Sequence, residues 1–146
     1  RPVGLGYQPI EMKYLLDTNI VSYFLRNASL GLSQHILDSP PETLAISVVS
    51  AGELRYGLSK LSSSKRATEL ANRLDALLAA IPVLPLPADA APHYGITRAQ
   101  LEAAGTPIGG NGLWIAAHAL AQNLTLVTNN TREFERVVGL RVENWL

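Results

Sequence analysis

Residues 14–20 read Tyr-Leu-Leu-Asp-Thr-Asn-Ile, and this stretch decides the fold. Its apolar run stops abruptly at Asp17, and two further polar residues follow. A short apolar run with a polar end is typical of a buried strand in a parallel sheet. The apolar residues that resume at Ile20 predict a helix over 20–25. The stretch therefore predicts the first strand–helix unit of an α/β domain.

The alternation of strand and helix continues along the chain. Further strands are expected at 45–49, 82–87, 124–127 and 140–142, the second of them a proline-punctuated edge strand. Helices are expected at 54–61, 70–81, 88–104, 113–122 and 132–138. Strands that alternate with helices pair in parallel and are covered on both faces. We therefore expect a three-layer α/β domain with a mostly parallel central sheet flanked by helices.

Length and composition bound the class of protein. The chain has 146 residues, 47% of them hydrophobic, which is enough to bury the core of one domain. We expect that domain at 12–146, and we interpret residues 1–11, polar and rich in Pro and Gly, as a leader or cloning remnant. The sequence has no cysteine, which fits a cytoplasmic protein. Its longest apolar runs are far shorter than the roughly 20 residues that span a bilayer, so no membrane partner is expected.

Charge balance limits the kind of nucleic-acid contact that the chain could make. Twelve Lys and Arg residues equal twelve Asp and Glu residues, so the formal net charge is zero. Proteins that hold long stretches of nucleic acid nonspecifically are usually basic. An RNA partner would therefore need a local basic patch and a shaped site.

Polar residues follow the expected strands at one edge of the sheet. Asp17 follows the first strand, Glu53 the second, and Asn129 and Asn130 the third clear strand. Ligands of open parallel sheets bind beyond the carboxyl ends of the strands. Neighbouring carboxylates repel each other unless a cation neutralises them, and oxygen ligands favour Mg²⁺ or Mn²⁺. This layout suits metal-assisted hydrolysis of a phosphodiester.

Each of these residues also has a purely structural interpretation. Asp17 could be only the N-cap of the following helix, and Glu53 could complete a capping box with Ser50. Asn129 and Asn130 are ordinary turn residues. The three histidines lack metal-ligand spacing, and we interpret them as structural or surface residues.

Four motifs, in order, resemble the VapC family of PIN-domain toxins. They are Tyr-Leu-Leu-Asp-Thr-Asn-Ile at 14–20, Ile-Ser-Val-Val-Ser-Ala-Gly-Glu-Leu-Arg-Tyr-Gly at 46–57, Ile-Gly-Gly-Asn-Gly-Leu-Trp-Ile-Ala-Ala-His at 108–118, and Leu-Val-Thr-Asn-Asn-Thr-Arg-Glu-Phe at 126–134. With the closing Glu-Asn-Trp at 143–145 they cover nearly the whole chain from Met12. A lone Asp-Thr-Asn would be weak evidence, whereas the ordered set is specific.

The resemblance implies a PIN fold and an endoribonuclease that hydrolyses RNA, often tRNA, with Mg²⁺ or Mn²⁺ held by a cluster of acids. It places Asp17 and Glu53 among the catalytic metal ligands, with Thr18, Asn111 and Thr128 as their supports. It also implies a cognate VapB-type antitoxin that blocks the active-site groove, and a homodimer. The amphipathic helices at 54–61 and 70–81 are candidates for those contacts, although core packing explains them equally well.

The chain departs from the family pattern at two positions. The family has Asn-Asp-Leu in the glycine loop, whereas this chain has Asn111, Gly112 and Leu113, so Gly112 marks a vacated Asp position. Asn130 matches the place of a fourth acid and could bind metal only weakly or through a water. Losing a carboxylate from a hard-cation site removes both charge and positioning. We therefore expect this chain to be inactive or weakened as a nuclease.

Four cations are candidate contacts for RNA phosphates, namely Arg26, Arg55, Lys60 and Arg132. Solvated surface charge is the simpler interpretation of each.

Two other functions are compatible with the sequence. The chain could be a binding module that no longer cuts and retains only antitoxin and RNA binding. A phosphatase that used Asp17 as nucleophile would need a second Asp two residues later, where this chain has Asn19, and no P-loop is present in the sequence.

Overall fold

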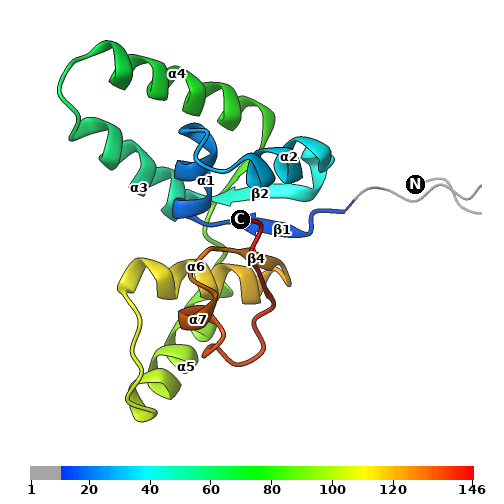
Figure 1. Ribbon diagram of the computed structural model, residues 1–146. Coiled ribbons are helices and arrows are strands. Elements are labelled where there is room, and N and C mark those ends of the chain that lie inside the picture. The colour runs from blue at the N-terminus through cyan, green and yellow to red at the C-terminus, as the bar shows by residue number, and fades with distance from the viewer. Residues whose placement is uncertain (1–10) are drawn as a thin grey trace, which may run out of the picture.

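The computed structural model describes residues 11–146, and it shows a sheet between two groups of helices (Figure 1). The leader expected at 1–11 falls outside the described residues except for Glu11. Five strands form one sheet in the order β3-β2-β1-β4-β5, and every neighbouring pair is parallel. The strands are β1 (Tyr14–Leu16), β2 (Leu44–Ser47), β3 (Val83–Leu84), β4 (Thr125–Val127) and β5 (Val142–Glu143). The predicted α/β class with a parallel central sheet is confirmed.

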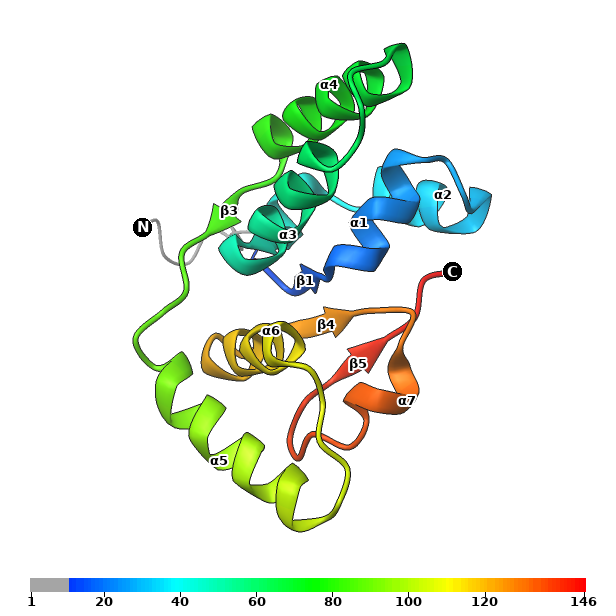
Figure 2. The same cartoon turned by 90° about the vertical axis from the view of Figure 1, so that its left-hand side faces the viewer.

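Helices cover both faces of this sheet, as Figure 2 shows from the side. On one face lie α1 (Thr18–Leu25), α2 (Leu30–Asp38), α3 (Val48–Ser59) and α4 (Lys65–Ala80). On the other lie α5 (Ala90–Ala103), α6 (Gly110–Ala121) and α7 (Thr131–Phe134). A short 3₁₀ turn (Pro41–Thr43) leads into β2. The expected three layers are therefore present.

Side chains of the central strands alternate between two hydrophobic cores. Leu16 and Val127 pack with the helices α1 to α4, whereas Leu15 and Leu126 pack with α5 to α7. All four are 0% exposed. Full burial of each such side chain is worth about 1.5–3 kcal/mol. This alternation fixes the register of β1 and β4, because a slip of one residue would exchange the two faces.

The start of α3 differs from the prediction. Strand β2 ends at Ser47, and the two valines that follow, predicted as strand, open the helix. Ser47 is the N-cap, and its Oγ accepts the backbone N–H of Val49 at 3.2 Å. The proposed capping box of Ser50 and Glu53 is therefore wrong, since the helix begins at Val48, two residues before Ser50. A local cap overrides the β preference of valine.

The sequence prediction also missed α2. Ser29 caps this helix by accepting the N–H of Leu32 at 3.2 Å, and Leu32 and Ile36 are buried. With only two buried residues in nine, its apolar periodicity was too weak to be recognised.

The order of the strands reverses at β1. The chain passes from β1 to β2 and β3 on one side, and then returns to place β4 on the other side of β1. Ligand crevices of open parallel sheets form at such a reversal, beyond the carboxyl ends of the strands. The end of β1, with its neighbour β4, is therefore where a site is expected. No helix in the described part of the chain has both the length and the apolar character to cross a membrane.

Candidate active site

Asp17 lies directly after β1 and is buried, with 5% of its surface exposed. Its Oδ1 accepts the backbone N–H of Ile20 at 2.9 Å, so it is the N-cap of α1, and that structural interpretation is confirmed. Burial raises the pKa of the Asp17 carboxyl, and the nearby charge of Glu53 raises it further. Hydrogen bonds from the Thr128 hydroxyl and the Ile20 amide oppose the rise. A cation beside this carboxylate would relieve the unfavourable charge.

Glu53 comes from α3 and is held by two side chains from other elements. The hydroxyl of Thr18 donates to its Oε1, and Asn111 Nδ2 donates to its Oε2 at 3.0 Å. Thr18 begins α1 and Asn111 lies in the first turn of α6, so Glu53 ties three helices together. Two of the three residues expected as supports, Thr18 and Asn111, contact this carboxylate directly. Both oxygens of Glu53 are thereby oriented before any ligand arrives.

The end of β4 supplies the opposite wall. Thr128 is fully buried, and its hydroxyl donates to Asp17 while its Oγ1 accepts the backbone N–H of Asn130 at 2.9 Å. Asn130 lines the hollow, and its Nδ2 donates to Glu133 Oε2 at 3.1 Å. Glu133 lies on α7 and lines the same hollow as Asp17 and Glu53. The sequence did not lead us to expect this carboxylate; the signal that could have found it is an acid in the first turn of the helix after β4.

Gly112 also lines the hollow, in the first turn of α6. A Cβ placed there would lie 3.4 Å from the Cζ of Phe134, at the edge of ordinary van der Waals contact. The backbone of Gly112 does not have the positive φ that favours glycine. An Asp therefore fits this position if the Phe134 ring moves by a few tenths of an ångström at most. Nothing in the local backbone requires a glycine.

The hollow thus gathers carboxylates from three elements around one opening. Its lining residues are Asp17, Thr18, Asn19, Glu53, Gly112, Ile115, Asn130, Glu133 and Phe134. The donors are oxygen atoms, the kind that Mg²⁺ and Mn²⁺ prefer. Within residues 11–146, however, no three His, Cys, Asp or Glu side chains lie close enough to hold an ion together. The donor atoms are of the kind that a hard cation prefers, but the described residues provide too few of them, and Gly112 lines the hollow without a side chain.

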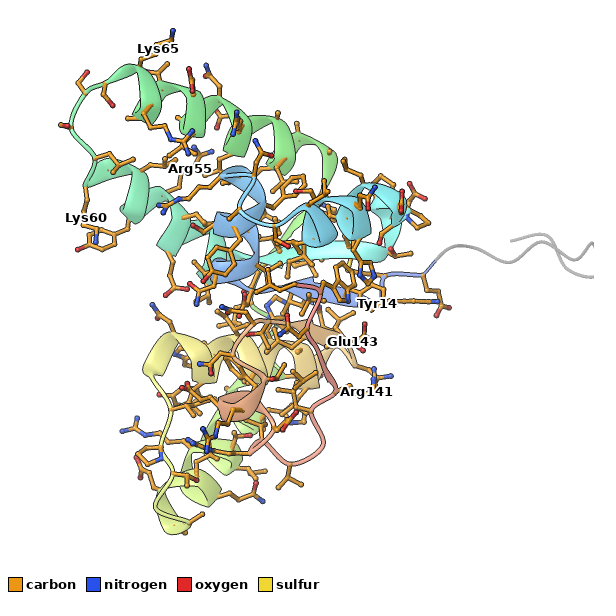
Figure 3. All side chains as sticks on the ribbon, in the orientation of Figure 1. Tyr14, Arg55, Lys60, Lys65, Arg141 and Glu143 are labelled. Carbon is orange, nitrogen blue, oxygen red and sulfur yellow. The ribbon has the colours of Figure 1, made fainter. Side chains whose placement is uncertain are left out.

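The four cations expected to contact RNA are differently placed. Arg55 Nη2 forms an ion pair with Asp75 at 2.7 Å, and Lys60 Nζ lies 4.8 Å from the ring centroid of Tyr56 (Figure 3). Arg26 lies at the end of α1 and lines a groove between α1, α3 and α4. Arg132 is exposed on α7, next to the Glu133 that lines the hollow. Arg26 therefore lines the groove and Arg132 adjoins a residue of the hollow, whereas Arg55 is already paired with Asp75.

A groove between α1, α3 and α4 leads away from the hollow. Thr18, Asn19 and Glu53 line both, so the two cavities adjoin each other. The far part of the groove is lined by leucines, namely Leu25, Leu54, Leu58, Leu61, Leu70 and Leu74. The groove can therefore accept an apolar segment that ends at the acidic hollow.

Comparison with known proteins agrees with this geometry. The family model described as "PIN domain" matches residues 14–140. The chain is 40% identical over 135 residues to "Ribonuclease VapC2" of Rickettsia felis, which covers 92% of this chain and 98% of that protein. It is 38% identical over 134 residues to the "tRNA(fMet)-specific endonuclease VapC" of Shigella flexneri, again over 92% and 98%.

A solved structure gives the same result for the fold. The crystal structure of VapBC2 from Rickettsia felis, bound to a DNA fragment from their promoter, contains a chain that superposes with a TM-score of 0.82 at 38% identity. The match covers 92% of this chain and all of that one. Sequence and fold therefore agree, and the chain belongs to the PIN domain family, among its VapC ribonucleases.

Proposed function

We propose that this chain is a VapC-type endoribonuclease toxin, acting on RNA and in particular on tRNA, whose catalytic site is incomplete at Gly112. The observation that carries the proposal is the meeting of Asp17 and Glu53 at the reversal point of the sheet. Residues from β1, α3, α6 and β4 converge there, with the glutamate oriented by Thr18 and Asn111. The names of the relatives point to the same reaction.

In the complete site, an ion of the Mg²⁺ or Mn²⁺ class would be held by Asp17, Glu53 and an Asp at position 112. When bound, such an ion activates water and offsets the negative charge that develops on the phosphate. Glu133 lines the same hollow and adds negative charge to it, and Asn130 orients Glu133. In this chain Gly112 contributes no oxygen, so both the affinity for the ion and the rate of hydrolysis should be low.

The protein partner proposed for the chain is a VapB-type antitoxin. The leucine-lined groove between α1, α3 and α4 runs into the acidic hollow, so one segment could fill the groove and cover the carboxylates. Leucines of the two helices expected to contact the antitoxin line it. The related VapBC2 of Rickettsia felis is an assembly bound to promoter DNA. The homodimer that the family implies remains a prediction, which light scattering on the purified chain would test.

One observation favours a second candidate function. Because the acids present do not form a group of three within residues 11–146, the chain could act as a binding module that holds antitoxin or RNA without cutting. The leucine-lined groove that would serve binding is not lined by Gly112. The two candidates differ in what happens when that carboxylate is supplied.

The test compares the unchanged chain with Gly112→Asp, each incubated with total tRNA and Mn²⁺, with EDTA in a parallel set. Gly112→Asn is the matched control, because it adds a side chain of the same shape without the charge. We expect cleavage by the Asp variant alone, abolished by EDTA. If no variant cuts, the binding module replaces the nuclease as the better account; equal cleavage by all three would show that position 112 does not matter.

A further inference from the structure

His118 is a buried titratable side chain that the proposed nuclease site does not use. It lies on α6 and is 0% exposed. Its Nδ1 lies 2.9 Å from Ser47 Oγ, and its Nε2 lies 3.0 Å from Gln122 Oε1. Both partners are uncharged, and burial lowers the pKa of the imidazole. The ring is therefore neutral near neutral pH, with both nitrogens hydrogen-bonded.

The two partners define which nitrogen carries the proton. The carbonyl oxygen of Gln122 can only accept, so Nε2 carries the hydrogen and donates to it. Nδ1 is then an acceptor for the hydroxyl of Ser47. The same Ser47 oxygen accepts the N–H of Val49 and caps α3. His118 therefore contacts the start of the helix that carries Glu53.

Two hydrogen bonds join α3 and α6, and their spacing matches. Ser47 and Glu53 are six residues apart at the start of α3, and Asn111 and His118 are seven residues apart on α6. At 1.5 Å per residue these spans are roughly 9 and 10 Å. Since Ser47 meets His118 and Glu53 meets Asn111, the helices run in opposite directions (Figure 1). Two contacts at matched spacing fix both the separation and the register of the helices.

We propose that His118, as the neutral Nε2-protonated imidazole, is a positioning residue that locks α6 against the cap of α3 and thereby sets the Asn111–Glu53 contact in the active site. The inference rests on the proposed function for its catalytic consequence only. Position 112 lies between Asn111 and His118 on α6, so the contacts of these two residues with α3 also position any side chain introduced there. His118 itself is buried within the helix layer and would touch neither RNA nor ion.

The first test measures, without RNA, the tautomer of His118 and the effect of this residue on the side chain of Asn111. Nitrogen-15 NMR on the unchanged chain should show His118 as a single neutral tautomer, protonated at Nε2. In His118→Leu the side-chain amide signals of Asn111 should shift and exchange faster, because the lock is lost. In His118→Asn they should return most of the way, because the Asn carbonyl oxygen can take the place of Nδ1 and accept from Ser47. His93→Asn on α5 is the matched control and should change nothing.

The second test uses Gly112→Asp as the active background. There His118→Leu should lower kcat about tenfold with little change in KM, and His118→Asn should restore most of it. A proton found on Nδ1, Asn111 signals indifferent to His118→Leu, or no rescue by Asn would each overturn the proposal. Absence of cleavage by Gly112→Asp itself would instead contradict the proposed function, and the NMR result would still decide the role of His118.

Discussion

Replacing Asp17 by Asn should stabilise the metal-free protein, although it removes a proposed ligand. The change deletes one negative charge from a side chain that is 5% exposed and keeps its shape. The cap of α1 survives, because an Asn oxygen can accept the Ile20 N–H as Oδ1 now does, and Asn caps helices about as well as Asp. The Thr128 hydroxyl can turn from donor to acceptor toward the new amide group.

Two effects of opposite sign set the magnitude. The start of α1 loses its attraction for a negative charge, which is worth about 0.3–1 kcal/mol. In return, the variant no longer buries the negatively charged carboxylate of Asp17. Burying such a charge costs several kcal/mol, and the hydrogen bonds to this carboxylate reduce that cost. We expect a net stabilisation of about 1–2 kcal/mol, or roughly 3–6 °C in Tm for a domain of this size.

The pH dependence gives this prediction its sharpest form. Because burial raises the pKa of Asp17, the folded state holds the proton more tightly than the unfolded state. The stability of the unchanged chain therefore falls as pH rises through the folded-state pKa, whereas the Asn variant does not show this loss. The difference in Tm should be small at about pH 4, near the unfolded-state pKa of an Asp, and clearly larger at about pH 7.

Thermal unfolding followed by circular dichroism in EDTA measures this difference. Asp89→Asn is the matched control, since Asp89 is an exposed N-cap whose side chain makes no capping hydrogen bond. Its Tm should barely move. An Asp17→Asn variant that melts below the unchanged chain at neutral pH, or a difference that is the same at both pH values, would refute the reasoning from desolvation.

Three further predictions concern the C-terminus, the buried histidine and metal binding. Trp145→Ala should lower the free energy of unfolding in urea by about 3–5 kcal/mol, because Trp145 is 5% exposed and its ring stacks on His35 with a centroid distance of 3.7 Å. A decrease of less than about 1 kcal/mol would contradict this packing. Because burial lowers the pKa of His118, the unfolded state takes up a proton at a higher pH than the folded state does. The free energy of unfolding should therefore fall as the pH drops below about 6.5, and His118→Asn should make this fall less steep in the same urea assay. Saturating Mn²⁺ should raise the Tm of Gly112→Asp clearly more than that of the unchanged chain, since ligand at about 100 times its Kd adds about 2.7 kcal/mol; equal shifts would remove position 112 from the site.

The sequence predicted the sheet because the central strands are short apolar runs that end in polar residues. Residues 14–16 and the strand before Thr128 have this form, and both lie at the reversal point of the sheet. Asp17 and Glu53 could be placed together because parallel strands end at one edge. The N-cap role of Asp17 was also predictable from its place before a helix.

The rest depended on contacts that a single sequence does not contain. The orientation of Glu53 by Thr18 and Asn111 joins residues 35 and 58 positions away from it. The partners of His118 are equally hidden, since Ser47 lies 71 residues earlier. Glu133 was overlooked because Asn130 matched the expected position, whereas the fold brings the acid one helical turn later into the hollow.

The most direct measurement of the central claim is cleavage of tRNA by Gly112→Asp, compared with Gly112→Asp combined with Glu53→Gln, in Mn²⁺ and in EDTA. Glutamine keeps the shape of Glu53, and its one carbonyl oxygen can accept from either Thr18 or Asn111, while the other partner can turn and accept from the glutamine NH2 group. The fold should therefore persist while the charge is lost. The account predicts cleavage by the single variant in Mn²⁺ alone, and none by the double variant. Undiminished cleavage by the double variant, or cleavage that persists in EDTA, would contradict a carboxylate-held metal site at this edge of the sheet.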